Sequence, residues 1–151
     1  MPPDALSPED PFEWLRRARS SLARARLGHG QPDVVLEDLC FDAQQASEKA
    51  LKALFVLKSA AVPRTHSIAD LLTALEGLGF EIPGQIQNAA SLTDYAVAAR
   101  YPGPSEPVDT QDFEAAVELA QAVVSWATEV VSSSRRAAGE GSNGTQGRGA
   151  Q

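Results

Sequence analysis

The segment from residue 33 to residue 58 carries the most regular pattern of apolar side chains in the chain. Apolar residues recur there at alternating steps of three and four, which is the spacing of one face of an α-helix. Further apolar side chains widen this stripe over much of the helix circumference, and such a helix belongs at the centre of a bundle. The stripe consists of Leu36, Leu39, Ala43, Ala46, Ala50, Ala53 and Leu57, widened by Val35, Leu51, Leu54 and Phe55.

Four further segments repeat with helical period, and none in the middle of the chain alternates with period two. Pro11 can begin the first of them and Gly28 can end it. Ser67 can cap the third helix of the chain, and Asp109 can cap the last. The sequence therefore predicts an all-α fold, an antiparallel bundle of four to five helices. Besides the central helix, these cover residues 11–28, 68–79, 84–101 and 109–131.

The length of 151 residues suits one globular domain with an adequate core and is too short for two. Prolines crowd the first 11 residues, and the segment after residue 131 has almost nothing to bury. We expect one helical domain over residues 12–131, between disordered segments at residues 1–11 and 132–151.

Composition excludes several classes of function. The formal charge of −7 argues against a general affinity for nucleic acid or for an anionic membrane, although a local basic patch stays open. One cysteine, Cys40, and two histidines supply neither a disulfide framework nor a zinc cluster, and the context of Cys40 favours burial. Without a signal peptide or an apolar run of roughly 20 residues, we expect a cytoplasmic protein with no metal or cofactor.

The stretch DYAVAARYPGP, residues 94–104, runs in helical register into an arginine and a tyrosine and stops at two prolines. Arg100 extends the apolar stripe of this helix, so its guanidinium is expected at the mouth of a groove. There it needs a carboxylate or a phosphate as partner. A structural role stays open, because a cation in the last turn also interacts favourably with the helix dipole. The stripe consists of Ile86, Ala90, Thr93 and Val97.

Two tyrosines and a histidine are further candidates for contact with a nucleotide or RNA. Tyr95 and Tyr101 are aromatic platforms on which a base can stack, or aromatic residues at the edge of the core. His66 precedes the third helix, whose positive end attracts an anion, but it can equally serve as a packing residue of the loop.

Lysines and arginines on the first two helices complete the candidates. Lys49 and Lys52 share a face with Gln45 and either line a groove or form a solvated edge, where Lys52 also pairs with Glu48 at i,i+4. Glu13 is placed to pair with Arg16 or Arg17. The five arginines of the first helix wrap around it, which favours a solvated surface over a nucleic-acid contact. They are Arg16, Arg17, Arg19, Arg24 and Arg26.

The order of these signals resembles the HEPN family of small helical-bundle proteins. The resemblance is carried by AQQASEKALKA in the central helix, by the histidine of THSIADLL, and by YAVAARYP before the last long helix. It covers residues 12–131 and implies a bundle that is often dimeric. The family includes toxins that cut RNA, partners of minimal nucleotidyltransferases in toxin–antitoxin pairs, and non-catalytic domains that bind nucleotides.

The RNases of that family generally carry an arginine followed four to six residues later by a histidine. No histidine follows Arg100 here, and the one pair at that spacing, Arg24 and His29, lies at the end of the first helix. The resemblance therefore favours a dimeric binding or regulatory module that recognises a nucleotide or RNA near Arg100, or works with a separately encoded nucleotidyltransferase as one component of a toxin–antitoxin-type pair. A metal-independent RNase toxin with a non-standard active site and a structural helical adaptor stay open, and no catalytic residue is assigned.

Overall fold

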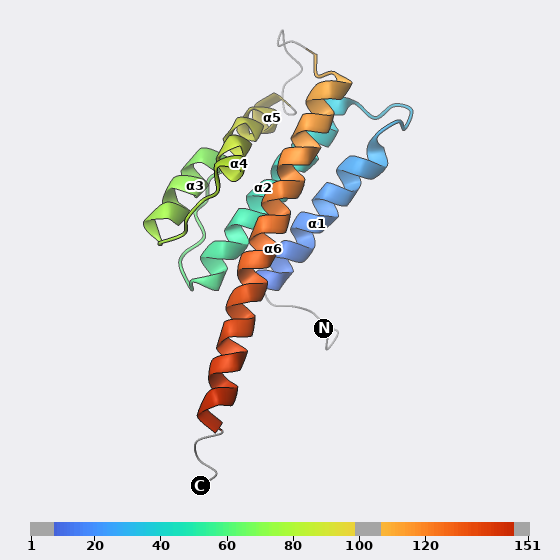
Figure 1. Cartoon of the computed structure of the whole chain (residues 1–151). Coiled ribbons are helices and arrows are strands. Elements are labelled where there is room, and N and C mark those ends of the chain that lie inside the picture. Colours follow the sequence, from blue (N-terminus) through green and yellow to red (C-terminus); the bar gives the residue numbers. More distant parts are fainter. Residues whose placement is uncertain (1–7, 99–106, 147–151) are drawn as a thin grey trace.

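The computed structural model describes the backbone of residues 8–98 and 107–146, and the side chains of residues 8–95 and 107–139. Every regular element in these ranges is helical, which confirms the predicted all-α class. Figure 1 shows the three long helices α1, α2 and α6 side by side, with α2 antiparallel to α1. None of the described helices is both long and apolar enough to cross a membrane.

Helix α1 (Pro11–Gly28) has the limits that its sequence predicts. Pro11 occupies the first turn, where its missing N–H costs nothing, and the Asp10 side chain accepts a hydrogen bond of 2.9 Å from the Phe12 amide. The Cβ-free face of Gly28 allows Leu39 of the next helix to approach, because an added Cβ would lie 2.5 Å from a Leu39 methyl carbon. The two helices therefore meet closely at this end.

Helix α2 (Leu36–Leu57) forms the centre of the bundle, as predicted, and packs on both α1 and α6. It begins later than the apolar pattern, because Asp33 has a positive φ of 67° that breaks helical continuity before it. Val35 is consequently 52% exposed and does not belong to the buried stripe. The buried apolar residues of α2 are Leu39, Cys40, Ala43, Ala46, Ala50, Leu51, Ala53, Leu54 and Phe55.

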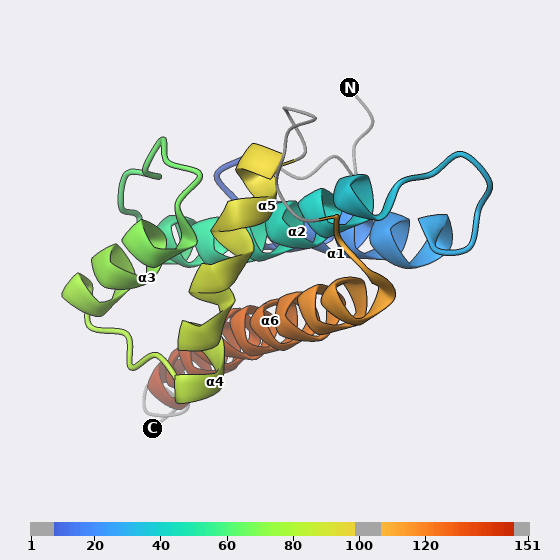
Figure 2. The same ribbon diagram turned by 90° about the horizontal axis from the view of Figure 1, so that it is seen from above.

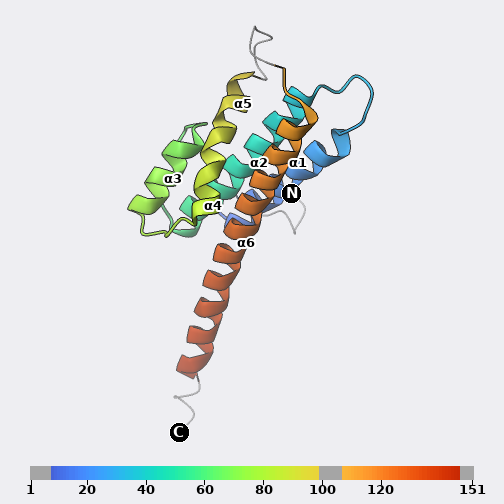
Figure 3. The same ribbon diagram turned by 45° about the horizontal axis from the view of Figure 1, so that its top comes forward.

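Helix α3 (Ile68–Gly77) begins behind Ser67, whose hydroxyl accepts a hydrogen bond from the Asp70 amide. The predicted single helix after Pro83 is instead divided into α4 (Gly84–Gln87), a 3-10 segment η1 (Asn88–Leu92) and α5 (Thr93–Ala98). Viewed from above, α5 lies against α2 and α4 lies against α6 (Figure 2), and Figure 3 shows α3 beside the α4–α5 run.

The division changes which side chains this part of the chain buries. Ile86, Ala89 and Leu92 are buried at steps of three, the period of a 3-10 helix, whereas Ala90 is only half-buried. The stripe from which the position of Arg100 was predicted therefore does not run in ideal α-helical register.

Helix α6 (Thr110–Gln146) starts with a reciprocal cap in which Asp109 and Asp112 each accept a hydrogen bond from the other's amide, at 2.8 and 3.1 Å. The predicted end at residue 131 differs from the structure, in which α6 continues to Gln146 (Figure 1), so the predicted disorder is not found over residues 132–146; residues 147–151 lie outside the described residues. Side chains from Ser133 to Gly139 are exposed, but Arg135 lies 4.4 Å from the centre of the Phe12 ring. The arginines and alanines at residues 135–138 are good helix formers, and with this cation–π contact they favour this part of the extension; the glycine-rich sequence of residues 139–146 gives no such reason.

Candidate functional site

A buried carboxylate, that of Glu48, gathers polar groups from two parts of the chain. Lys52 Nζ donates to its Oε1 at 2.6 Å, and His66 Nδ1 lies 3.0 Å from the same oxygen. The Gln44 and Gln45 amides donate to Oε2 at 3.0 and 3.1 Å. Among the described residues, no buried side-chain nitrogen or oxygen lacks a hydrogen-bond partner. Two of the predicted candidates, Lys52 and His66, thus meet at one anion.

The electrostatics of this cluster favour the ionised carboxylate. Burial raises the pKa of Glu48, but hydrogen bonds from Lys52 and Gln44 outweigh burial, and the pKa lies below its ordinary value. The side chain of Lys52 is only 11% exposed, so this cation is matched to a specific anion. The predicted i,i+4 pair of Glu48 and Lys52 is therefore present, inside the bundle and not on a solvated edge.

His66 connects the cluster to the surface. Its backbone carbonyl accepts a hydrogen bond of 3.2 Å from Gln44, and its side chain is 59% exposed while Nδ1 faces Glu48. A carboxylate at Nδ1 holds the proton on that nitrogen, which leaves Nε2 on the opposite side of the ring. Close by, the Ile68 amide donates to Thr93 Oγ1 at 2.9 Å, which ties the start of α3 to the start of α5.

Lys49 does not join this cluster. It points toward α1, where Nζ donates to Ser21 Oγ at 2.9 Å. Burial lowers the pKa of Lys49, and the charges of Arg24 and Arg17 lower it further. The predicted shared face of Lys49, Lys52 and Gln45 is accordingly split, because Lys49 serves the α1 side and the other two contact Glu48.

The remaining candidates are Tyr95, Arg100 and Tyr101. Tyr95 is half-buried and packs against the core, and burial raises the pKa of its hydroxyl. Arg100 and Tyr101 lie outside the described residues. The structure therefore places Tyr95 at the edge of the core and leaves the other two as predictions.

Arg24 and His29, which have the spacing of the arginine and histidine in the family's RNases, make separate contacts. Arg24 pairs with Asp42 of α2 at 2.9 Å, whereas His29 follows the last residue of α1 and its ring centre lies 4.6 Å from that of Phe113. The described residues form no cluster of three or more metal-ligating side chains. Cys40 is buried as expected, and burial raises the pKa of its thiol to about 12. A thiol with that pKa is not a nucleophile at neutral pH.

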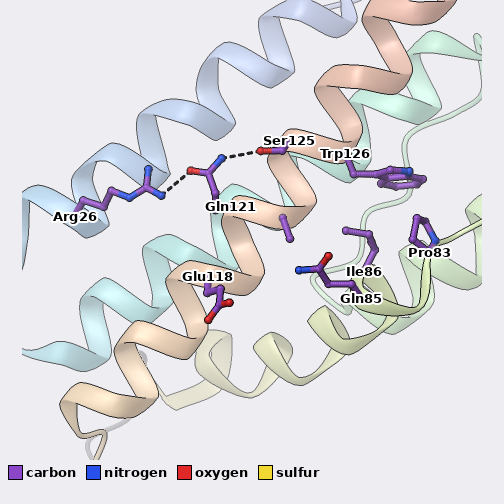
Figure 4. Close-up of a pocket in the computed structure, with 9 residues that line it drawn as sticks. Arg26, Pro83, Gln85, Ile86, Glu118, Gln121, Ser125 and Trp126 are labelled. Atoms are coloured by element: carbon purple, nitrogen blue, oxygen red, sulfur yellow. Dashed lines mark hydrogen bonds between the residues drawn. The ribbon is translucent and has the colours of Figure 1, made fainter.

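Several cavities of the described residues lie away from the Glu48 cluster. One has a volume of about 390 Å³ and is lined by Pro8, Glu13, Trp14, Arg17 and Lys49. Another, of about 530 Å³, lies between α4 and α6, and Figure 4 shows a chain of hydrogen bonds from Arg26 through Gln121 to Ser125 along one edge of it. Its opposite wall consists of Pro83, Gln85, Ile86 and Trp126.

Sequence reasoning missed two central residues, Glu48 and Gln44, as parts of a site. The signal was present, because Gln44, Glu48 and Lys52 follow one another at steps of four on a helix that is otherwise largely apolar. Polar residues in that register inside a buried helix need one another as partners. No comparable sequence pattern predicted the cavity of about 390 Å³ beside Trp14. Its lining residues come from Pro8, from α1 and from α2, and only the fold brings these together.

Comparison with known proteins gives matches over most of the chain. The family model described as "HEPN domain" matches residues 12–131, the range over which the sequence resembles that family. The crystal structure of TT1696 from Thermus thermophilus is similar with a TM-score of 0.70 and 34% identity, over 79% of this chain and 96% of that one. The structure of ST0689, an archaeal HEPN homologue, is similar with a TM-score of 0.63 and 25% identity, over 81% and 98%. No curated protein matches.

Proposed function

Because this chain belongs to the HEPN domain family, we propose that it is a binding or regulatory module that recognises a nucleotide or RNA through His66, Arg100 and Tyr101. The observation that carries the proposal is the imidazole of His66, which is held by the buried carboxylate of Glu48 and yet is 59% exposed. Such an arrangement presents one ring nitrogen to a ligand in a fixed orientation.

The chemistry of this group suits a phosphate. Lys52 and the imidazole of His66 both contact the one carboxylate of Glu48, so a protonated imidazole would leave the cluster with an excess positive charge. Nε2 of the ring can then donate a charge-assisted hydrogen bond to an anionic oxygen. Arg100 would supply a further cation, and Tyr101 would border the ligand.

An RNase with a non-standard active site is the alternative in the enzyme class. Arg24 is bound to Asp42 and His29 packs on Phe113, so the only pair at the RNase spacing is engaged in other contacts. This favours binding over cleavage. Incubation of a short single-stranded RNA with the protein is expected to leave the RNA intact, and cleavage that Arg24→Ala or Arg100→Ala abolishes would favour the RNase.

Calorimetric titration with the nucleoside triphosphates and a short single-stranded RNA tests the proposal. Removing a charge-assisted contact costs about 1.5–3 kcal/mol, so Arg100→Ala and His66→Ala should each weaken binding by roughly tenfold or more. Arg64→Ala removes an exposed charge close to His66 in sequence and should change affinity far less. Equal affinities of the wild type and Arg100→Ala, with a lower melting temperature for the variant, would reduce Arg100 to a structural cap.

The proposal includes two partners, a second copy of the chain and a nucleotidyltransferase-fold protein. Apolar residues of α6 that remain only half-buried support the dimer, because partly accessible apolar surface is typical of interfaces. Light scattering at micromolar concentration should give the dimer mass, and co-expression with a nucleotidyltransferase encoded beside this chain should yield a complex. A monomer mass, or a nucleotidyltransferase that elutes separately, would contradict the respective part. The residues concerned are Val117, Leu119, Ala122, Trp126 and Val130.

A further inference from the structure

The pocket at the start of α1 has a rigid aromatic wall. Trp14 is half-buried, and its indole Nε1 donates a hydrogen bond of 2.8 Å to the carbonyl of Pro8. This bond fixes the plane of the ring along a cavity of about 390 Å³. A fixed indole is a surface on which a flat ring can stack.

The same pocket has an excess of positive charge. The buried carboxylate of Glu13 already accepts hydrogen bonds from Arg16 and Arg17, at 2.7–2.9 Å. Lys49 on the opposite side has the neutral hydroxyl of Ser21 as its partner, and no carboxylate of the described residues is within ion-pair distance of its Nζ.

The charge on Lys49 is less favourable in the ligand-free protein than in water. Burial lowers the pKa of Lys49 first, followed by repulsion from Arg24 and Arg17, and attraction to Asp42 and Glu48 offsets this only in part. An anion placed between Lys49 and Arg17 would offset both effects, because it would supply the charge that this half-buried ammonium lacks.

We propose that this pocket binds a small anion that carries a flat ring, with the ring on Trp14 and the charge between Lys49 and Arg17. The cavity is at the lower end of the range for small-molecule sites, so it admits one ring with one anionic group and excludes a folded RNA. A nucleoside monophosphate and an aromatic carboxylate share this chemistry. The pocket is separate from the proposed site at His66, since Lys49 faces α1 whereas Glu48 faces the segment before α3.

The two tryptophans of the chain allow a direct test. Protein labelled with fluorotryptophan gives one fluorine resonance for Trp14 and one for Trp126, which lines the other cavity and serves as an internal control. Adenosine monophosphate or benzoate should shift the Trp14 resonance saturably and leave that of Trp126 in place. Inorganic phosphate and adenosine alone should have much weaker effects, since each supplies half of the recognition.

Charge variants complete the test. Lys49→Gln and Arg17→Gln should each weaken this binding by roughly tenfold, and the second variant changes a side chain that is 66% exposed, so the fold is preserved. Lys58→Gln removes an exposed cation from the end of the same helix α2 and should leave the affinity unchanged.

The outcomes separate this inference from the proposed function. His66→Ala and Arg100→Ala should not alter the Trp14 shift, and Lys49→Gln should not alter RNA binding. Failure of both adenosine monophosphate and benzoate to shift Trp14 would overturn the inference. Binding that shifts Trp126 instead, or that depends on His66 and not on Lys49, would overturn it equally.

Discussion

The two buried carboxylates of the bundle, Glu48 and Glu13, hold cations in different ways. Glu48 joins Lys52 of its own helix to His66, 18 residues further along the chain. Among the described residues, Glu13 bonds only to Arg16 and Arg17, within the first turns of α1. The first cluster is therefore a tertiary contact that orders a loop, whereas the second is a local contact that shapes one edge of a pocket.

Solvent access separates the two clusters further. Lys52 is 11% exposed, whereas Arg16 and Arg17 are 63% and 66% exposed. An exposed arginine stays hydrated when its carboxylate partner is removed. A buried ammonium has no water to replace the lost carboxylate. Similar ion pairs in one sequence therefore differ in their contribution to stability according to where the fold places the cation.

The largest expected effect is that of Glu48→Ala. This variant leaves Lys52 buried without its anion, which costs about 3–5 kcal/mol of the free energy of unfolding. Urea denaturation measures the loss, with Glu114→Ala as the control on an exposed site of α6.

A double variant tests whether the loss of stability comes from the unpaired charge of Lys52. Replacing both charges, as in Glu48→Leu with Lys52→Met, should recover much of the stability, because an apolar pair needs no partner. If Glu48→Ala is no more destabilising than Glu114→Ala, the Glu48 cluster does not contribute to the free energy of unfolding as claimed.

Glu13→Ala should destabilise the protein less than Glu48→Ala does. Its two arginines stay hydrated, and their attraction to Glu13 is screened by salt. The same urea experiment at low and high salt measures this, and the loss should shrink as salt is added. A loss equal to that of Glu48→Ala at both salt concentrations would remove the distinction between the clusters.

Acid should weaken both clusters. Hydrogen bonds from Arg16 and Arg17 lower the pKa of Glu13 from 4.5 to about 2, and the pKa of Glu48 is lowered as well. The unfolded chain takes up these protons first, so the stability present above pH 4.5 is lost as pH falls. For Glu13 the loss continues to about pH 2, and Glu13→Gln should flatten that part of a stability curve measured by urea denaturation. An unchanged curve would contradict the assignment.

His66→Ala should have the smallest effect on stability, because its imidazole is 59% exposed. A contact of this kind is worth about 1 kcal/mol or less. Thermal melts should therefore differ by a few degrees at most, in contrast to the loss of ligand binding expected of the same variant. A large drop in melting temperature would indicate that His66 is mainly structural.

The bundle could be predicted from the sequence because its signals are local. The apolar period of α2, the proline at the start of α1 and the capping aspartates of α6 all act within a few residues. The division of residues 84–98 could not, because burial of Ala89 in place of Ala90 depends on how this segment packs on α2 and α6. The end of α6 was missed because the segment after residue 131 buries almost nothing, while the contact of Arg135 with the Phe12 ring depends on the fold.

The same difference between local signals and contacts that depend on the fold applies to the candidate sites. The Glu48–Lys52 pair follows from i,i+4 spacing, but the contact with His66 depends on the path of the segment between α2 and α3. Lys49 was assigned to the wrong face because the neighbouring helix, which no local pattern specifies, supplies Ser21 as its partner. Arg100 and Tyr101 lie outside the described residues and stay predictions.

The central claim, that a ligand binds at His66, is tested most directly by NMR of the imidazole C–H protons. The chain has two histidines, and His29, packed on Phe113 beyond the end of α1, is the internal control. Titration of the wild type with a short single-stranded RNA and with the nucleoside triphosphates should move the His66 resonances saturably and leave those of His29 in place. Binding detected by calorimetry without any change at His66, or with a change at His29 alone, would contradict the claim.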